Sequence, residues 1–145
     1  MAIRTDRVAQ SEQLVLDRIR ESIDVTSQLL EGTIGMQVAS VAEAIIGAYR
    51  AEGKLLLFGN GGSSADAQHL AAEMCGRFLI DRRPLPAIAL SDNTAAVTAI
   101  GNDYAFEEVF ARQVEGLGKA GDVAVGLTTS GRSRNVIAGL SSART

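Results

Sequence analysis

The stretch Leu55-Leu56-Leu57-Phe58-Gly59-Asn60-Gly61-Gly62-Ser63-Ser64 decides the fold class of this chain. Its four consecutive apolar residues are typical of a strand buried on both faces, and such strands occur in parallel sheets. The glycines and serines that follow are typical of a tight turn, and we expect a helix over 64–78 after it. A buried strand, a glycine-rich turn and a helix in this order predict an α/β domain.

The same rhythm returns twice further along the chain. Short apolar runs predict strands at 87–90 and 122–127, helices are expected up to residue 100 and over 105–117, and a last helix begins near Asn135. Strands that alternate with helices pair in parallel through right-handed crossovers. Because three strands make a thin sheet, we expect a fold that stops before its sheet is finished.

Two helices are expected ahead of the first strand. Apolar residues recur at helical spacing over 8–31, Gly32 ends that run, and a second helix is predicted over 36–51. We therefore divide one domain, 1–145, into an N-terminal helical hairpin (1–52) and the first part of an α/β sheet (53–145). The apolar stripe of these helices needs a cover, and periodicity leaves open whether the sheet or another subunit supplies it.

Composition and charge exclude several classes of function. A net charge of -3 without a basic stripe argues against nucleic-acid binding. No apolar run approaches the roughly 20 residues that a membrane helix needs. The polar segment 1–10 does not resemble a signal peptide, and the single Cys75 cannot form an internal disulfide. These features predict a cytoplasmic protein that binds neither nucleic acid nor membranes.

The loops after the first and third strands predict a phosphorylated ligand. In open parallel sheets, ligands bind outside the carboxyl ends of the strands. The first loop (59–64) offers backbone N–H groups at a helix N-terminus, and the third (128–133) offers four hydroxyls around Gly131. Neither loop contains the lysine of a nucleotide-binding P-loop, and the glycine pattern of dinucleotide-binding folds is not matched.

The helix after the first loop carries three residues that suit chemistry. Asp66, His69 and Glu73 stand at i, i+3 and i+7, so they share one face. His69 and Glu73 are one turn apart and can bind one metal ion, for which zinc is a suitable candidate, and a carboxylate beside a sugar carbonyl can act as a base. The alternative is an ordinary polar face on which Glu73 pairs with Arg77. Spacing alone leaves both interpretations open, and two ligands do not close a metal site.

Two further polar segments stand between the predicted elements. Asn102-Asp103-Tyr104 lies in a break between helices, where we expect it on the ligand side of the sheet. We interpret Arg82-Arg83-Pro84 as a solvated loop rather than a phosphate clamp.

Taken together, these motifs resemble the phosphoheptose (sedoheptulose 7-phosphate) isomerases of the sugar-isomerase (SIS) superfamily. The resemblance rests on four stretches and covers nearly all of the chain: Gly59-Asn60-Gly61-Gly62-Ser63, Asp66-Ala67-Gln68-His69-Leu70-Ala71-Ala72-Glu73, Ala99-Ile100-Gly101-Asn102-Asp103-Tyr104 and Thr129-Ser130-Gly131 with Ser133. It implies a three-layer, flavodoxin-like parallel sheet, a homotetramer, and conversion of sedoheptulose 7-phosphate to a glycero-manno-heptose 7-phosphate for bacterial lipopolysaccharide heptose.

The resemblance also implies roles for individual residues. Zinc would be bound by His69 and Glu73, and Glu73 would be the base of the enediol proton transfer. The residues implied to contact the substrate are Asn60, Gly61, Gly62, Ser63, Glu73, Asn102, Asp103, Thr128, Thr129, Ser130 and Ser133.

The sequence departs from the family pattern at several points. Thr128 stands where the family usually has Ser, and Arg132 and Arg134 replace what are commonly Asn and a small residue or Pro. The family continues through two further strands and a helix that brings a Gln and a His to the metal, so we expect this chain to be weakly active or inactive by itself. The alternative is a non-catalytic protein of this fold that binds a phosphosugar or a protein partner.

Overall fold

The structure, a computed structural model, describes residues 2–144, with side chains from residue 7 onward. Two compact units are present, of which the first ends at Glu43 and the second begins at Ala44. This boundary falls inside the second helix. The sequence instead predicts a division after residue 52, between the two N-terminal helices and the α/β part of the chain.

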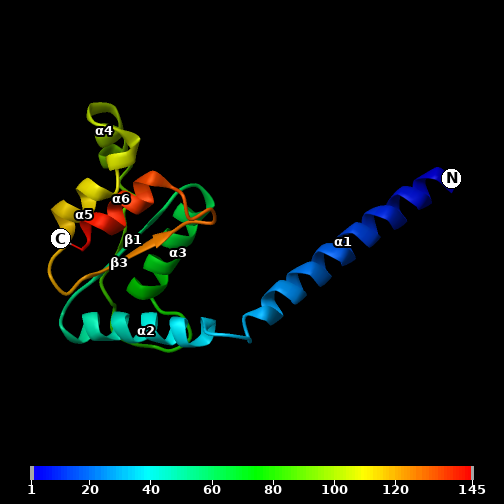
Figure 1. Cartoon of the computed structure of the whole chain (residues 1–145), viewed down its shortest axis with the longest axis horizontal. Helices are drawn as coiled ribbons and strands as arrows, with labels where there is room; N and C mark the ends of the chain where they lie inside the picture. Colours follow the sequence, from blue (N-terminus) through cyan, green and yellow to red (C-terminus); the bar gives the residue numbers. More distant parts are fainter. Residues whose placement is uncertain (1, 145) are drawn as a thin grey trace. The chain divides into compact units, whose positions relative to one another are not determined.

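Two helices form the N-terminal part of the chain (Figure 1). Helix α1 (Ala2–Gln28) is followed by a turn in which Gly32 has a φ of 73°, and helix α2 (Ile34–Arg50) follows. Both helices agree with the sequence expectation, although each begins earlier. Their pairing as a hairpin stays a prediction. None of the helices within residues 2–144 combines the length and the apolar character that a membrane crossing requires.

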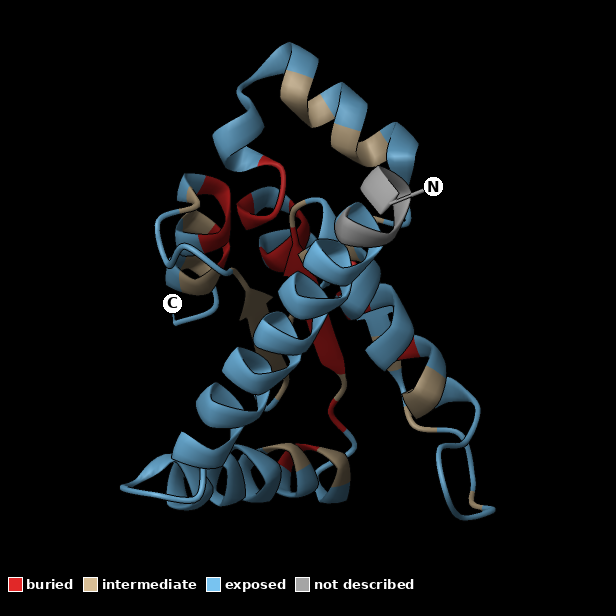
Figure 2. Cartoon of the chain, turned by 90° about the vertical axis from the view of Figure 1, so that its right-hand side faces the viewer, coloured by how far each residue is buried: buried red, intermediate tan, exposed pale blue. Residues whose placement is uncertain are grey.

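The second unit is built on a parallel sheet of three strands, β1 (Leu55–Gly59), β2 (Ala87–Ala89) and β3 (Val123–Leu127). The spatial order is β2-β1-β3, with Leu55 opposite both Ala87 and Val123. Every residue of β1 is buried, as its apolar sequence predicts (Figure 2). The α/β class and the parallel sheet are therefore confirmed.

Alternate residues of β1 enter two separate cores. Leu55 and Leu57 pack with Ala67 and Ala71 of helix α3 (Gly62–Cys75) and with the last turns of α2. Leu56 and Phe58 pack on the opposite side of the sheet. Because successive side chains of a strand point to opposite faces, this one short run holds both helical layers on the sheet.

Four helical elements form the layer on this second side of the sheet. They are α4 (Thr94–Asp103), the 3₁₀ turn η1 (Phe106–Glu108), α5 (Ala111–Leu117) and α6 (Arg134–Ser142). The core beneath them also contains Leu90, Val109, Phe110, Val114 and Val136. The rings of Phe58 and Phe110 lie 5.1 Å apart at its centre. The single helix expected over 105–117 is wrong, because η1 and a shorter α5 replace it.

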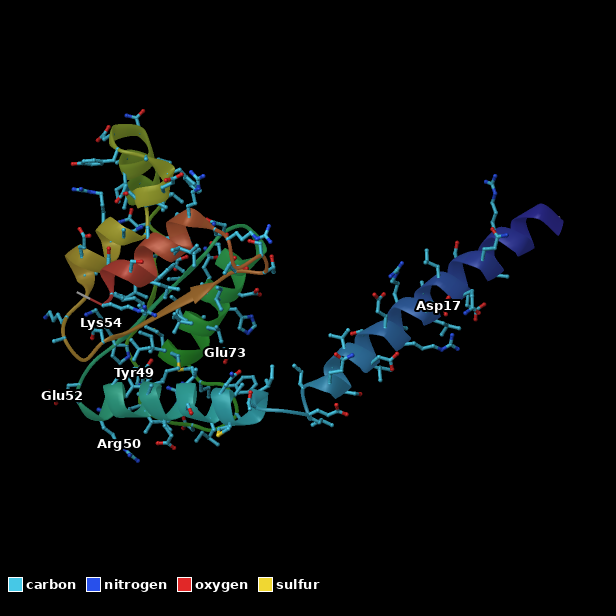
Figure 3. All side chains as sticks on the ribbon, viewed as in Figure 1. Asp17, Tyr49, Arg50, Glu52, Lys54 and Glu73 are labelled. Carbon is cyan, nitrogen blue, oxygen red and sulfur yellow. The ribbon has the colours of Figure 1, made fainter. Side chains whose placement is uncertain are left out.

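An ion pair joins the amino-terminal ends of β1 and β3. Lys54 Nζ pairs with Asp122 Oδ2, and the N–H of Lys54 donates to Asp122 Oδ1 at 2.9 Å. Burial acts to raise the pKa of the Asp122 carboxyl. The hydrogen bonds from Lys54 and from the N–H of Lys119 outweigh burial and hold that pKa below its usual value. Figure 3 shows Lys54 at this end of the sheet, away from the loops that follow β1 and β3.

Candidate functional site

The strand order places the first and third loops side by side. In the order β2-β1-β3, the strand that follows β1 in sequence lies on one side of it, and β3 lies on the other side. The chain connections therefore run in opposite directions from the point between β1 and β3. Open α/β sheets bind ligands at such a point. A Cβ atom at Gly59 would lie 2.8 Å from both Leu127 O and Ser63 Cβ. A glycine at the end of β1 therefore lets the strand, β3 and the start of α3 approach one another closely.

A pair of asparagines joins these two loops. Asn60 Nδ2 donates to Asn135 Oδ1 at 2.9 Å, and Asn135 Nδ2 donates to Asn60 Oδ1 at 2.8 Å. Asn135 Oδ1 also accepts from the N–H of Val136 at 3.0 Å. Asn135 is buried in the first turn of α6, whereas Asn60 is half-buried. The two amides thus fix the distance between the loops that would face one ligand.

The first loop presents the amino-terminal end of α3. Gly61 precedes the helix with a φ of 55°, and no side chain caps it. The first N–H groups of a helix lack partners within the helix, and they attract anions. Gly61 and Gly62 are exposed and Ser63 is half-buried. Ser64 Oγ donates to Ser91 Oγ at 2.6 Å, which ties this turn to the loop after β2.

The third loop is a cluster of hydroxyls. Thr128 Oγ1 lies 3.2 Å from Ser133 Oγ and 3.4 Å from Ser130 Oγ, while Thr129 is exposed. The N–H of Arg132 donates to Ser130 Oγ at 3.2 Å, and Gly131 makes the turn with a φ of 65°. The structure therefore brings together three of the four hydroxyls of this loop, which follows the strand next to β1. Hydroxyls and helix N–H groups suit the oxygens of a sugar phosphate.

His69 and Glu73 face each other on α3, with 3.3 Å between His69 Nε2 and Glu73 Oε1. The His69 side chain is 73% exposed, whereas that of Glu73 is 30% exposed. Glu73 pairs with His69 in the structure, and the alternative pairing with Arg77 is absent from the salt bridges among the described residues. A half-buried carboxylate beside an accessible imidazole offers a possible base and two possible metal donors on one helix face. Glu73 is labelled in Figure 3.

The donor chemistry suits zinc, but the described residues do not complete a zinc site. Within residues 2–144, no three His, Cys, Asp or Glu side chains gather closely enough to hold a metal ion. Asp66 is exposed one helical turn before His69 and is not part of such a group. A zinc ion needs about three or four protein ligands, and His69 and Glu73 could supply only two of them.

The break expected at Asn102 and Asp103 is wrong, because α4 continues to Asp103, and both residues are exposed in its last turn. Asn102 Nδ2 donates to Asp103 Oδ1 at 2.8 Å. Among the described residues, no hydrogen bond joins either side chain to the first or third loop. Their role in substrate binding stays a prediction.

Two residues were assigned no role from the sequence. The sequence predicts only that a helix starts near Asn135. The one signal for a further role is an amide side chain placed next to the apolar residues of that helix. Arg82 was interpreted as solvated, which is wrong: it is half-buried, and its guanidinium donates to the carbonyl oxygens of Glu73 at 2.8 Å and Met74 at 2.9 Å. Arg83, in contrast, is exposed as expected.

The two unusual arginines of the third loop behave differently from each other. Arg134 Nη1 donates to Glu107 Oε1 at 2.9 Å, so its charge is engaged with η1. The side chain of Arg132 is exposed at the turn beside Gly131. Of the two, Arg132 is the one available to an anion at the loop.

Comparison with known proteins identifies the family. The family model described as the SIS domain matches residues 19–145, which include both loops and the whole of α3. The chain therefore belongs to the SIS domain family, as the sequence resemblance implied.

Phosphoheptose isomerases are among the similar proteins within this family. The phosphoheptose isomerase of Roseiflexus sp. (strain RS-1) is 54% identical over 130 residues, which cover 90% of this chain and 66% of the relative. That of Aquifex aeolicus (strain VF5) is 56% identical over 124 residues, or 86% of this chain and 64% of the relative. The solved phosphoheptose isomerase of Neisseria gonorrhoeae is 44% identical with a TM-score of 0.83, covering 92% of this chain and 68% of that one. The chain spans about two thirds of the length of these relatives.

Proposed function

We propose that the protein is a sedoheptulose 7-phosphate isomerase, which interconverts this ketose phosphate and the glycero-manno-heptose 7-phosphate aldose. The observation that carries the proposal is the half-buried Glu73 opposite His69, on the helix that begins at the first ligand loop. Support also comes from the phosphoheptose isomerases at 54% and 56% identity. None of the relatives described above is named as a binding protein, so the non-catalytic alternative gains no support from them.

The two linked loops would hold the sugar phosphate. The N-terminal N–H groups of α3 and the hydroxyls of Thr128, Thr129, Ser130 and Ser133 suit phosphate and sugar oxygens. The side chain of Arg132 is available to add a positive charge at the same loop. Binding at these loops would orient the sugar relative to α3, which starts directly after the first of them.

The role of Glu73 would be to move a proton between two neighbouring sugar carbons. Its carboxylate removes a proton from C1 of the ketose, the electrons of that C–H bond form the C1–C2 double bond, and the C2 carbonyl oxygen takes up a proton. In the resulting enediol, the O1 hydroxyl then loses its proton, the C1 carbonyl forms and Glu73 returns the carbon-bound proton to C2. The reaction is balanced without an oxidant or reductant, because hydrogen is only relocated within the sugar.

Zinc is part of the proposal, with His69 and Glu73 as two of its ligands and the others supplied from outside the described residues. When bound, zinc would polarise the sugar oxygens as a Lewis acid. His69 is accessible enough to coordinate a metal ion, since its side chain is 73% exposed. Glu73 would then serve both as a zinc ligand and as the base of the proton transfer.

We further propose a homotetramer in the cytoplasm. Helix α1 exposes a long series of apolar side chains, namely Val8, Leu14, Val15, Leu16, Ile19, Ile23, Val25 and Leu29. Exposed apolar surface of this extent is typical of an interface. A second copy of the chain would cover it. A reducing compartment suits the unpaired Cys75.

The test is an isomerisation assay with sedoheptulose 7-phosphate on the full chain, comparing wild type, Glu73→Gln and Asp66→Asn. Glu73→Gln keeps the shape of the side chain and removes the base, so we expect a fall in kcat of roughly 10²–10⁴-fold. Asp66→Asn is the matched control, since it neutralises an exposed carboxylate on the same helix, and it should leave kcat unchanged. Full activity of Glu73→Gln would refute the proposal, and sugar-phosphate binding without even weak turnover would favour the non-catalytic alternative.

A further inference from the structure

The segment that follows α3 folds back onto the end of that helix through Arg82. Arg82 Nη2 donates to Glu73 O at 2.8 Å, and Arg82 Nη1 donates to Met74 O at 2.9 Å and to Arg83 O at 3.0 Å. Two nitrogens of one guanidinium thus hold two successive carbonyls of the last helical turn. This is a fork geometry that arginine provides and lysine does not.

Helix α3 has no basic residue of its own in its last turn. The final carbonyls of a helix lack intrahelical partners, and they carry the negative end of the helix dipole. The N–H of Gly76 donates to Ala72 O and the N–H of Leu85 donates to Met74 O. Arg82 supplies a donor to Glu73 O and a second donor to Met74 O, and it adds the positive charge that this helix end favours.

A further group near this end of α3 is Tyr49 of α2, which is labelled in Figure 3. It packs against the core that includes Ala71, and its hydroxyl is buried without a hydrogen-bond partner in the described part of the chain. Burial raises the pKa of Tyr49, Cys75 acts in the same direction, and the charge of Arg82 opposes both. Arg82 is half-buried, and its hydrogen bonds hold the guanidinium against the end of α3 rather than fully extended into solvent.

We propose that Arg82 is a positioning residue for Glu73, an inference that rests on the proposed function of Glu73 as the base. Arg82 binds the backbone carbonyl of Glu73 itself, so it fixes the residue at the root of its side chain. The side chain projects from this fixed point towards His69 Nε2, 3.3 Å away. Small displacements of a catalytic group carry large kinetic penalties, of the order of 10²-fold for about 1 Å.

The kinetic test compares Arg82→Gln, Arg82→Lys and Arg83→Gln in the full chain with sedoheptulose 7-phosphate as substrate. We expect Arg82→Gln to lower kcat by about 10-fold or more with KM changed less than about twofold, because substrate binding at the loops is untouched. Arg82→Lys should recover only part of kcat, since one ammonium cannot reproduce the fork. Arg83→Gln removes the same charge from the neighbouring exposed residue and should retain wild-type kcat.

Several outcomes would overturn the inference. These are an unchanged kcat in Arg82→Gln, an equal loss in Arg83→Gln, and full activity of Arg82→Lys. A lower melting temperature with unaltered kcat would assign Arg82 a purely structural role and would also refute the inference.

A second measurement does not depend on turnover. Hydrogen exchange of Arg82→Gln should show at least about 10-fold weaker protection of amides in segment 72–76, with segment 64–68 of the same helix unchanged and Arg83→Gln like wild type. A wild type that binds sugar phosphate without even weak turnover would favour the non-catalytic alternative, whereas a localised loss of protection would still support the clamp on α3. Unchanged protection together with unchanged kcat would refute the clamp while leaving the proposed function intact.

Discussion

Asn60 and Asn135 exchange two side-chain hydrogen bonds, of 2.9 and 2.8 Å, across a separation of 75 residues in the chain. Asn60 follows β1 and Asn135 lies in the first turn of α6. The pair therefore links the first and third loops, to which we assign sugar-phosphate binding. Asn135 is 3% exposed. A buried amide without its partner costs about 1–3 kcal/mol, which makes this pair significant for stability as well as for binding.

We expect Asn135→Ala to lower the free energy of unfolding by about 1–3 kcal/mol, because it leaves the amide of Asn60 without its partner. The affinity for sugar phosphate should fall as well, since the loops lose their fixed separation. Denaturant titration and ligand binding of Asn60→Ala, Asn135→Ala and the double variant form a cycle that isolates the pair. The double variant should cost less than the sum of the single ones. Asn102→Ala, at an exposed site, is the stability control, and strict additivity within the cycle would contradict the interpretation.

Metal removal tests the zinc proposal at His69. His69→Ala should weaken zinc binding by more than about 100-fold, because even residues that only orient a metal ligand contribute roughly 10–100-fold. A chelator should likewise strip zinc from the wild type, with turnover lost and then restored by added zinc. Zinc affinity, measured by competition with a metal-binding dye, should be unchanged in Asp66→Asn. Equal affinity in His69→Ala and wild type would exclude this residue as a ligand.

The elements of the sheet could be predicted from the sequence because their signals are local. The apolar run of β1 and the glycines and serines after it specify a buried strand and a turn within ten residues. The same locality explains why His69 and Glu73 were correctly expected on one helix face, since spacing along a helix fixes their separation.

The contacts that sequence reasoning missed depend on tertiary packing. Nothing near Asn60 or Asn135 indicates that each is the partner of the other. The helix expected over 105–117 is interrupted because Val109 and Phe110, although adjacent, both enter the same core. Val109 and Phe110 stand between η1 and α5, and their burial depends on the elements that pack over them rather than on a spacing visible in the sequence. Arg82 was misinterpreted for a related reason, because the carbonyls that it binds belong to a helix that ended several residues earlier.

The ion pair of Lys54 and Asp122 predicts acid sensitivity. Because the folded pKa of Asp122 is lowered, its contribution to stability is complete above the ordinary aspartate pKa of about 3.9 and is lost as the pH falls through the folded value. Asp122→Asn should therefore lower the melting temperature at neutral pH and flatten its decline below about pH 4. Asp17→Asn, which removes a carboxylate of an exposed pair in α1, is the control and should retain the wild-type profile. An acid profile of Asp122→Asn identical to that of the wild type would contradict this role.

Two helical glycines test the close packing of α6 on β1, because one is tightly surrounded by core side chains and the other is not. A Cβ atom at Gly139 would lie 2.8 Å from Cε2 of Phe58 and 3.0 Å from Cβ of Phe110, and Phe58 is fully buried and cannot withdraw. Gly139→Ala should therefore lower the free energy of unfolding by about 1–3 kcal/mol through overpacking, despite the better helix propensity of alanine. At Gly116 in α5, the same added methyl group would meet no described atom within 4 Å beyond its chain neighbours and its own helix backbone, so Gly116→Ala should raise the free energy of unfolding by up to about 1 kcal/mol. Opposite signs in denaturant titrations are the expected result. Stabilisation by both substitutions would mean that α6 can move away from Phe58. The spacing between α6 and the sheet would then not be rigid, and this rigid spacing is what we expect to hold Asn135 in position.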